Sequence, residues 1–157
     1  MTALNIDVMT AEIEVPFGGP ITFSVKIIPN TEERVEEYLV ILEYQDDLDR
    51  TCREMCSIGI FRALLKRADT LKRYVDAENF GSQHPSKEYQ GAWILWDGKA
   101  KIDTIAIKDF EHMPDISPKG LSSLVELLSK AAIRIESIET EAFNKAMEGS
   151  LRSSLCD

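Results

Sequence analysis

The chain has 157 residues, a net charge of −9, 44% hydrophobic residues and 29% charged residues, which predicts one soluble globular domain with its own core. Even the longest apolar runs, such as Tyr38 to Leu42, are too short to cross a bilayer, and the N-terminus lacks the basic and apolar regions of a signal peptide. We therefore expect a cytoplasmic protein, in the host cytoplasm if it is viral.

The charge is divided between two neighbouring segments. Glu32 to Asp49 holds eight acidic residues and one arginine, whereas Arg50 to Arg73 holds seven basic and two acidic residues. The acidic segment could attract a basic protein surface, and the overall acidity argues against a nucleic-acid partner. The alternative is two solvated faces of opposite sign. The candidate acidic partner surface consists of Glu32, Glu33, Glu36 and Glu37.

Strands are predicted in the first third of the chain. Between residues 21 and 27, apolar residues alternate with polar ones, the period of a strand with one buried face. The preceding segment 16–20 is rich in proline and glycine and predicts a turn after a first strand. Residues 37–45 are ambiguous: their β-branched centre favours a strand, but an acidic first turn also permits a helix over 31–45.

A central helical segment is predicted over 47–76, because apolar residues recur there at spacings near three and four. Cys52 and Cys56 are four residues apart in it, but a zinc site needs two more ligands, and we expect small core residues and free thiols instead. Residues 77–91 are predicted to be a surface loop.

A β-hairpin over 92–107 follows. Its two strands flank Asp97 and Gly98, the residue pair that a type I′ turn favours. Trp93 and Leu95 point to one side and Ile94 and Trp96 to the other, so we expect the hairpin to be covered on both faces.

Catalytic motifs are few in this sequence. It has no Gly-x-Ser-x-Gly elbow, no phosphate-binding loop and no dinucleotide fingerprint, so no cofactor or small-molecule substrate is indicated. His112, with Asp109 and Glu111 close by, is the one group that suggests an acid–base or metal site. The same residues are also typical of a polar segment that follows a strand.

A long C-terminal helix is predicted over 118–147. Ser117 is suited to the N-cap and Pro118 to the first helical position, and Gly149 is suited to follow the end. Such a helix would measure about 45 Å. We expect one α+β domain over 1–148, with a mostly antiparallel sheet of about five strands, and a flexible tail over 149–157.

Apolar residues repeat every seven positions along this last helix. One set begins at Leu121 and the other at Leu124, which together form a heptad seam. We expect the first half to pack on the protein's own sheet and the second half, with Ile133 and Phe143 off the seam, to meet another helix. An entirely intramolecular core helix is the alternative. The candidate oligomer interface consists of Ile135, Ile138, Ala142 and Phe143.

The sequence therefore favours a non-enzymatic protein-interaction or assembly protein that self-associates through its last helix, such as a viral or phage accessory or structural protein. One alternative is an acidic inhibitor or immunity-type protein that binds a basic partner. Another is a small enzyme with a site around Asp109, Glu111 and His112.

Overall fold

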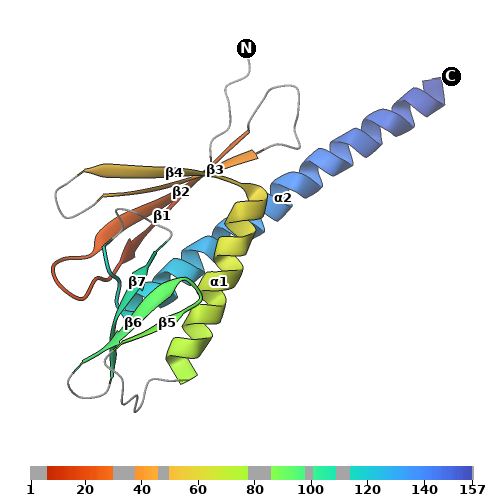
Figure 1. Cartoon of the computed structure of the whole chain (residues 1–157). Helices are drawn as coiled ribbons and strands as arrows, with labels where there is room; N and C mark the ends of the chain where they lie inside the picture. Colours follow the sequence, from red (N-terminus) through yellow and green to blue (C-terminus); the bar gives the residue numbers. More distant parts are fainter. Residues whose placement is uncertain are drawn as a thin grey trace.

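The computed structural model describes residues 7–29, 38–45, 50–77, 86–97, 101–108 and 114–156 (Figure 1). The predicted α+β class is confirmed, because two antiparallel sheets, of four and three strands, combine with a central helix and a long C-terminal helix. The elements in chain order are β1 (Asp7–Ile13), β2 (Ile21–Pro29), β3 (Tyr38–Gln45), β4 (Thr51–Ser57), α1 (Ile58–Ala77), β5 (Ser86–Tyr89), β6 (Ala92–Trp96), β7 (Ile102–Ile107) and α2 (Pro118–Cys156).

The four-stranded sheet has the order β1-β2-β3-β4, with each strand antiparallel to its neighbours. The alternation in β2 is borne out, since Phe23, Val25 and Ile27 are buried. Residues 38–45 form a strand rather than a helix, and Val40 and Leu42 lie beside Ile27 and Val25 in the same core. A central strand buries side chains on a pleated surface, which suits the β-branched centre of this segment.

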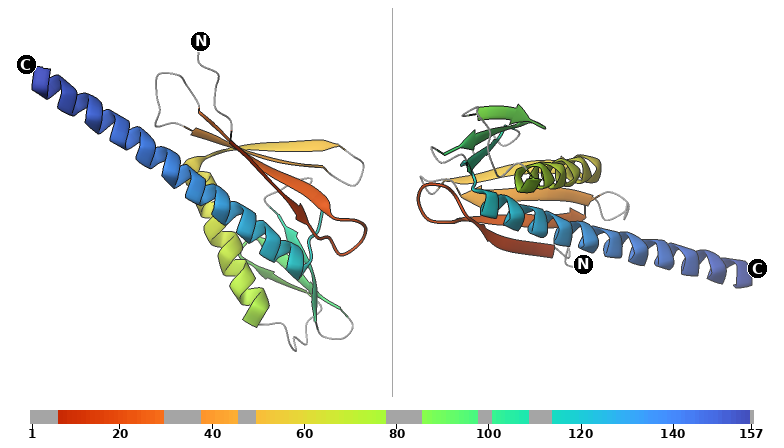
Figure 2. Two further views of the ribbon diagram at one scale, coloured as in Figure 1. Left: turned by 180° about the vertical axis from the view of Figure 1, so that it is seen from behind. Right: turned by 90° about the horizontal axis from the view of Figure 1, so that it is seen from below.

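Both helices cover the same face of the four-stranded sheet (Figure 2). Phe61, Leu64 and Leu71 of α1 enter the core, and α2 contributes Leu121 and Leu128. The sheet β5-β6-β7 packs beside the first part of α2, and a backbone bridge between Ile105 and Ile116 joins it to the segment that leads into α2. The described residues therefore enclose one continuous core.

The predicted helix over 47–76 begins later than expected, at Ile58, and residues 51–57 form β4 instead. Cys52 and Cys56 do share a face, but in a strand Met55 points to the opposite side and is 70% exposed. Pairing with β3 makes residues 51–57 a strand, because β3 would otherwise be left with one row of unpaired backbone groups. Ser57 ends β4 and caps α1, since its Oγ accepts a hydrogen bond from Ile60 N at 3.2 Å.

The 92–107 hairpin is present, but its turn is not the predicted two-residue one. Trp96 pairs with Ile102, and Asp97 N donates to Lys101 O at 2.7 Å, so the connection spans five positions. Gly98 lies outside the described residues. The predicted cover on both faces is also wrong, because Trp93 is 42% exposed.

A two-residue turn occurs one hairpin earlier, between β5 and β6. Gln90 and Gly91 have φ angles of 51° and 75°, which are the two positive values that a type I′ turn requires. The segment 77–91, which was predicted to be a loop, therefore contains the short strand β5 and the turn that joins it to β6. Ser86, Lys87 and Glu88 open that strand, so its sequence carries no apolar alternation.

The long helix begins where predicted. Ser117 Oγ accepts a hydrogen bond from Gly120 N at 3.0 Å, so Ser117 is the N-cap. The helix continues past Met147 to Cys156, because Gly149 keeps a negative φ and does not act as a left-handed stop. Whether residues 149–157 move independently stays a prediction. The C-terminal part of α2 extends beyond both sheets and beyond α1 (Figures 1 and 2).

Candidate functional site

Two groups of predicted functional residues lie outside the described residues. These are the acidic partner surface Glu32, Glu33, Glu36 and Glu37, and the acid–base group Asp109, Glu111 and His112. In the ranges that the structure describes, no three histidine, cysteine, aspartate or glutamate side chains come together as metal ligands.

The heptad seam of α2 lies in the protein's own core over its first two thirds. Leu121, Leu124, Leu128 and Ala131 are fully buried, and so is Ile135, which is 1% exposed. Ile135 was predicted to contact another copy, but it packs in this core and we leave it out of the proposed interface. Ile138, also predicted there, is half-buried and packs against the edge of the core.

Two ion pairs mark the place where α2 leaves the rest of the protein. Arg134 Nε lies 3.2 Å from Asp7 Oδ1 of β1, and Arg62 Nη2 of α1 lies 3.0 Å from Glu139 Oε1. From Thr140 to Gly149, each side chain that the structure describes is exposed. The body of the protein therefore supports α2 as far as Glu139.

Among the α2 side chains that the structure describes, the large apolar ones that are exposed are Ile133, Phe143 and Met147, at 67%, 64% and 48%. Their spacings of ten and four residues place them within about 80° of one another around the helix. The core seam centred on Ile135 lies about 120° away from this group. We call these three residues the outward stripe. Of the predicted interface residues, Phe143 belongs to it, and the side chain of Ala142 lies outside the described ones.

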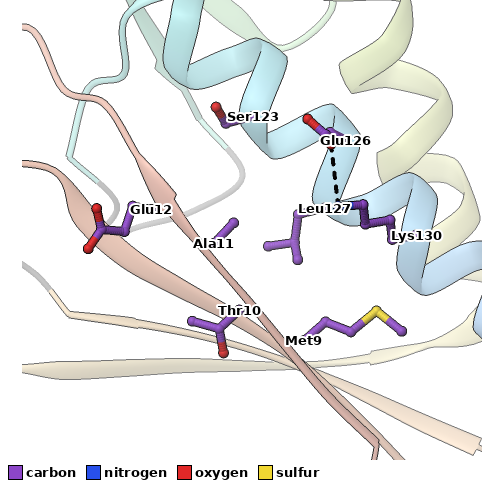
Figure 3. A pocket seen from close by; sticks show the side chains of 8 residues that line it. All are labelled: Met9, Thr10, Ala11, Glu12, Ser123, Glu126, Leu127 and Lys130. Carbon is purple, nitrogen blue, oxygen red and sulfur yellow. Dashed lines mark ion pairs between the residues drawn. The ribbon is translucent and has the colours of Figure 1, made fainter.

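A groove runs between β1 and α2, with a volume of about 330 Å³. Figure 3 shows the side chain of Leu127 pointing from α2 towards Met9 and Ala11 of β1. Ser123, Glu126 and Lys130 complete the helix side of the groove, and Thr10 and Glu12 complete the strand side. Sequence reasoning missed this groove, since nothing local indicates that β1 is an edge strand beside α2.

The other face of the four-stranded sheet is polar at its centre. Glu43 Oε2 accepts hydrogen bonds from Lys26 Nζ and Arg53 Nε, both at 2.9 Å. The hydrogen bond from Lys26 holds the pKa of the Glu43 carboxyl below its usual range, with Arg53 adding to the effect. Exposed Val8 and Met55 lie at the two edges of this face, and the partly buried Ile28, Leu39 and Ile41 lie next to Met55 on it.

Among the described residues, no helix is long and apolar enough to span a membrane. Comparison of the chain with protein-family models, with curated proteins and with solved structures gave no match.

Proposed function

We propose that this chain is a non-enzymatic interaction or assembly protein that associates with a second copy of itself through the outward stripe of α2. One observation supports the proposal above all. Ile133, Phe143 and Met147 are exposed on one side of a helix that continues well past the core it belongs to (Figure 1). A helix segment gains most of its stability from packing an apolar face, and this segment has no such packing within the described part of the chain.

The energetic scale is sufficient for self-association. Burying one isoleucine, phenylalanine or methionine side chain stabilises by about 1.5–3 kcal/mol. A symmetric pair of helices would bury the stripe of both copies. The summed burial free energy of these side chains is comparable with an association cost of about 4–15 kcal/mol. The expected product is a dimer or small oligomer that dissociates on dilution.

Size-exclusion chromatography with light scattering tests the proposal. The wild type should be larger than a monomer at tens of micromolar. A double variant, Phe143→Glu with Met147→Glu, should be monomeric and should keep its circular dichroism spectrum and melting temperature, because both side chains are exposed.

Lys145→Glu is the matched control. It makes the same change of two charge units on the same exposed segment, but about 200° around the helix from Phe143. It should leave the oligomer intact. A wild-type monomer at high micromolar concentration would contradict the proposal, as would dissociation by the control alone.

A further inference from the structure

The groove between β1 and α2 lies between two contacts that join these elements. At one end, Arg134 of α2 pairs with Asp7. At the other, Ser117 N donates to Glu14 O at 3.1 Å, just beyond the end of β1. Between these two contacts, Met9 and Ala11 are partly exposed, and Leu127 is 3% exposed and lies at the base of the groove (Figure 3).

β1 is the first strand of its sheet and pairs with β2 on one side. In the described part of the chain, no strand pairs with its other side. An edge strand carries a row of backbone N–H and C=O groups that can pair with a further strand. Here those groups border a groove whose other wall is a helix.

The side chains around the groove divide by chemistry. Met9, Ala11 and Leu127 supply an apolar centre. Glu126 and Lys130 form an exposed ion pair at 3.3 Å on the helix side. Glu12 is exposed on the strand side and makes no ion pair or hydrogen bond with any residue that the structure describes. Because neighbouring residues of a strand point to opposite faces of the sheet, Glu12 and Ala11 would lie beside side chains on opposite faces of an added strand.

We propose that this groove binds an extended segment of a partner protein, which adds to β1 as a fifth strand of the sheet. The segment carries small apolar side chains at every second position, which pack against Met9 and Ala11 above Leu127. It carries a lysine or arginine on the opposite face, beside Glu12. Main-chain pairing supplies affinity in this mode of recognition, and the alternating side chains supply specificity. The inference does not depend on self-association, because the groove and the outward stripe lie on different parts of α2.

A synthetic peptide tests the groove directly. The probe has the length of β1, 7 residues, alternates valine with lysine, and has blocked ends and a fluorescent label. The wild-type protein should bind it with a micromolar Kd in an anisotropy titration. Amide resonances of residues 8–12 and 123–130 should shift on binding. A second probe, methylated on alternate backbone nitrogens, should bind about tenfold more weakly because strand pairing is blocked.

A charge reversal tests the acidic side of the groove. Glu12→Lys should weaken binding of the valine–lysine peptide about tenfold. Glu148→Lys is the matched control, since it makes the same charge change near the far end of α2, and it should bind as the wild type does.

Three results would overturn the inference: no binding at millimolar peptide, equal binding of the methylated probe, or resonance shifts confined to other regions. Loss of self-association in Glu12→Lys would make a second copy the occupant and would also overturn it.

Discussion

One guanidinium nitrogen of Arg62 donates hydrogen bonds to both carboxylate oxygens of Glu139, at 3.0 and 3.1 Å, across a separation of 77 positions in the sequence. The pair joins the first turns of α1 to the last part of α2 that the core supports. Both side chains are about half exposed, at 51% and 41%. The contact therefore contributes little to the stability of the fold.

Removing this pair should have a small and salt-dependent effect. We expect Glu139→Gln to lower the free energy of unfolding by about 0.2–1 kcal/mol at low salt, and by less at high salt. Urea unfolding at two salt concentrations measures it. Glu141→Gln is the control, because Glu141 is exposed and has no ion-pair partner among the described side chains. Equal effects of the two substitutions would contradict this account of the pair.

Gly120 is required by the close approach of α2 to the end of β1. A Cβ atom at this position would overlap the carbonyl oxygen of Glu14, the same oxygen that accepts the hydrogen bond from Ser117 N. Gly120→Ala should destabilise the protein by about 1–3 kcal/mol through overpacking, although alanine is the better helix former. Thermal and chemical unfolding measure the change.

The comparison for Gly120 is Gly149→Ala in the same helix. Apart from its chain neighbours and the backbone of its own helix, no described atom lies within 4 Å of a Cβ added at Gly149, so helix propensity alone should act there. We expect a gain of up to about 1 kcal/mol. A neutral Gly120→Ala would show that the end of β1 moves away at little cost.

The turn at Gln90 and Gly91 should be sensitive at its second position. Gly91 has a φ of 75°, and Gly91→Val should cost about 1–3 kcal/mol because β-branched residues are strained at positive φ. Gln90→Asn should leave stability equal or higher, since asparagine is favoured in type I′ turns. Melting temperatures of the two variants decide this, and a tolerated valine would contradict the turn assignment.

Cys56 should stay reduced and react slowly. Along β4, four residues span about 13 Å, so Cys52 and Cys56 are too far apart for a disulfide. Cys56 is buried and Cys52 is half-buried, so we expect slower alkylation of Cys56 in the native state. Mass spectrometry after timed alkylation separates the two sites. A Cys52–Cys56 disulfide in non-reduced peptide maps would contradict the strand.

The same thiol predicts a dependence of stability on alkaline pH. Burial raises the pKa of Cys56, and the nearby Glu54 carboxylate adds to the shift. The folded state therefore keeps the protonated thiol while the unfolded chain ionises near its ordinary pKa of about 8.5. The contribution of the buried Cys56 thiol to the free energy of unfolding is fully present below that pH, and it is lost as the pH rises through the pKa of the folded state. The stability difference between wild type and Cys56→Ala should shrink from neutral pH to about pH 10. A difference that stays constant would contradict it.

Local patterns predicted the elements whose signals lie within one segment. Alternation in β2 and the capping residue Ser117 both correspond to what the structure contains. The predicted element boundaries that are wrong lie where pairing with a strand distant in the sequence determines the local structure. Residues 51–57 carry spacings that fit a helix, and pairing with β3 makes them a strand. The polar strand β5 has no apolar pattern of its own and forms beside β6.

The α+β class, the antiparallel strands and a last helix with more apolar surface than one seam follow from local patterns in the chain. Which apolar residues of that helix are buried in the protein's own core depends on tertiary packing. Ile135 and Phe143 are both large apolar residues of the predicted interface, yet one is 1% exposed and the other 64%. The edge position of β1 beside α2 was decided in the same way. Periodicity specifies which side chains share a face, whereas the packing of distant elements specifies which faces stay open.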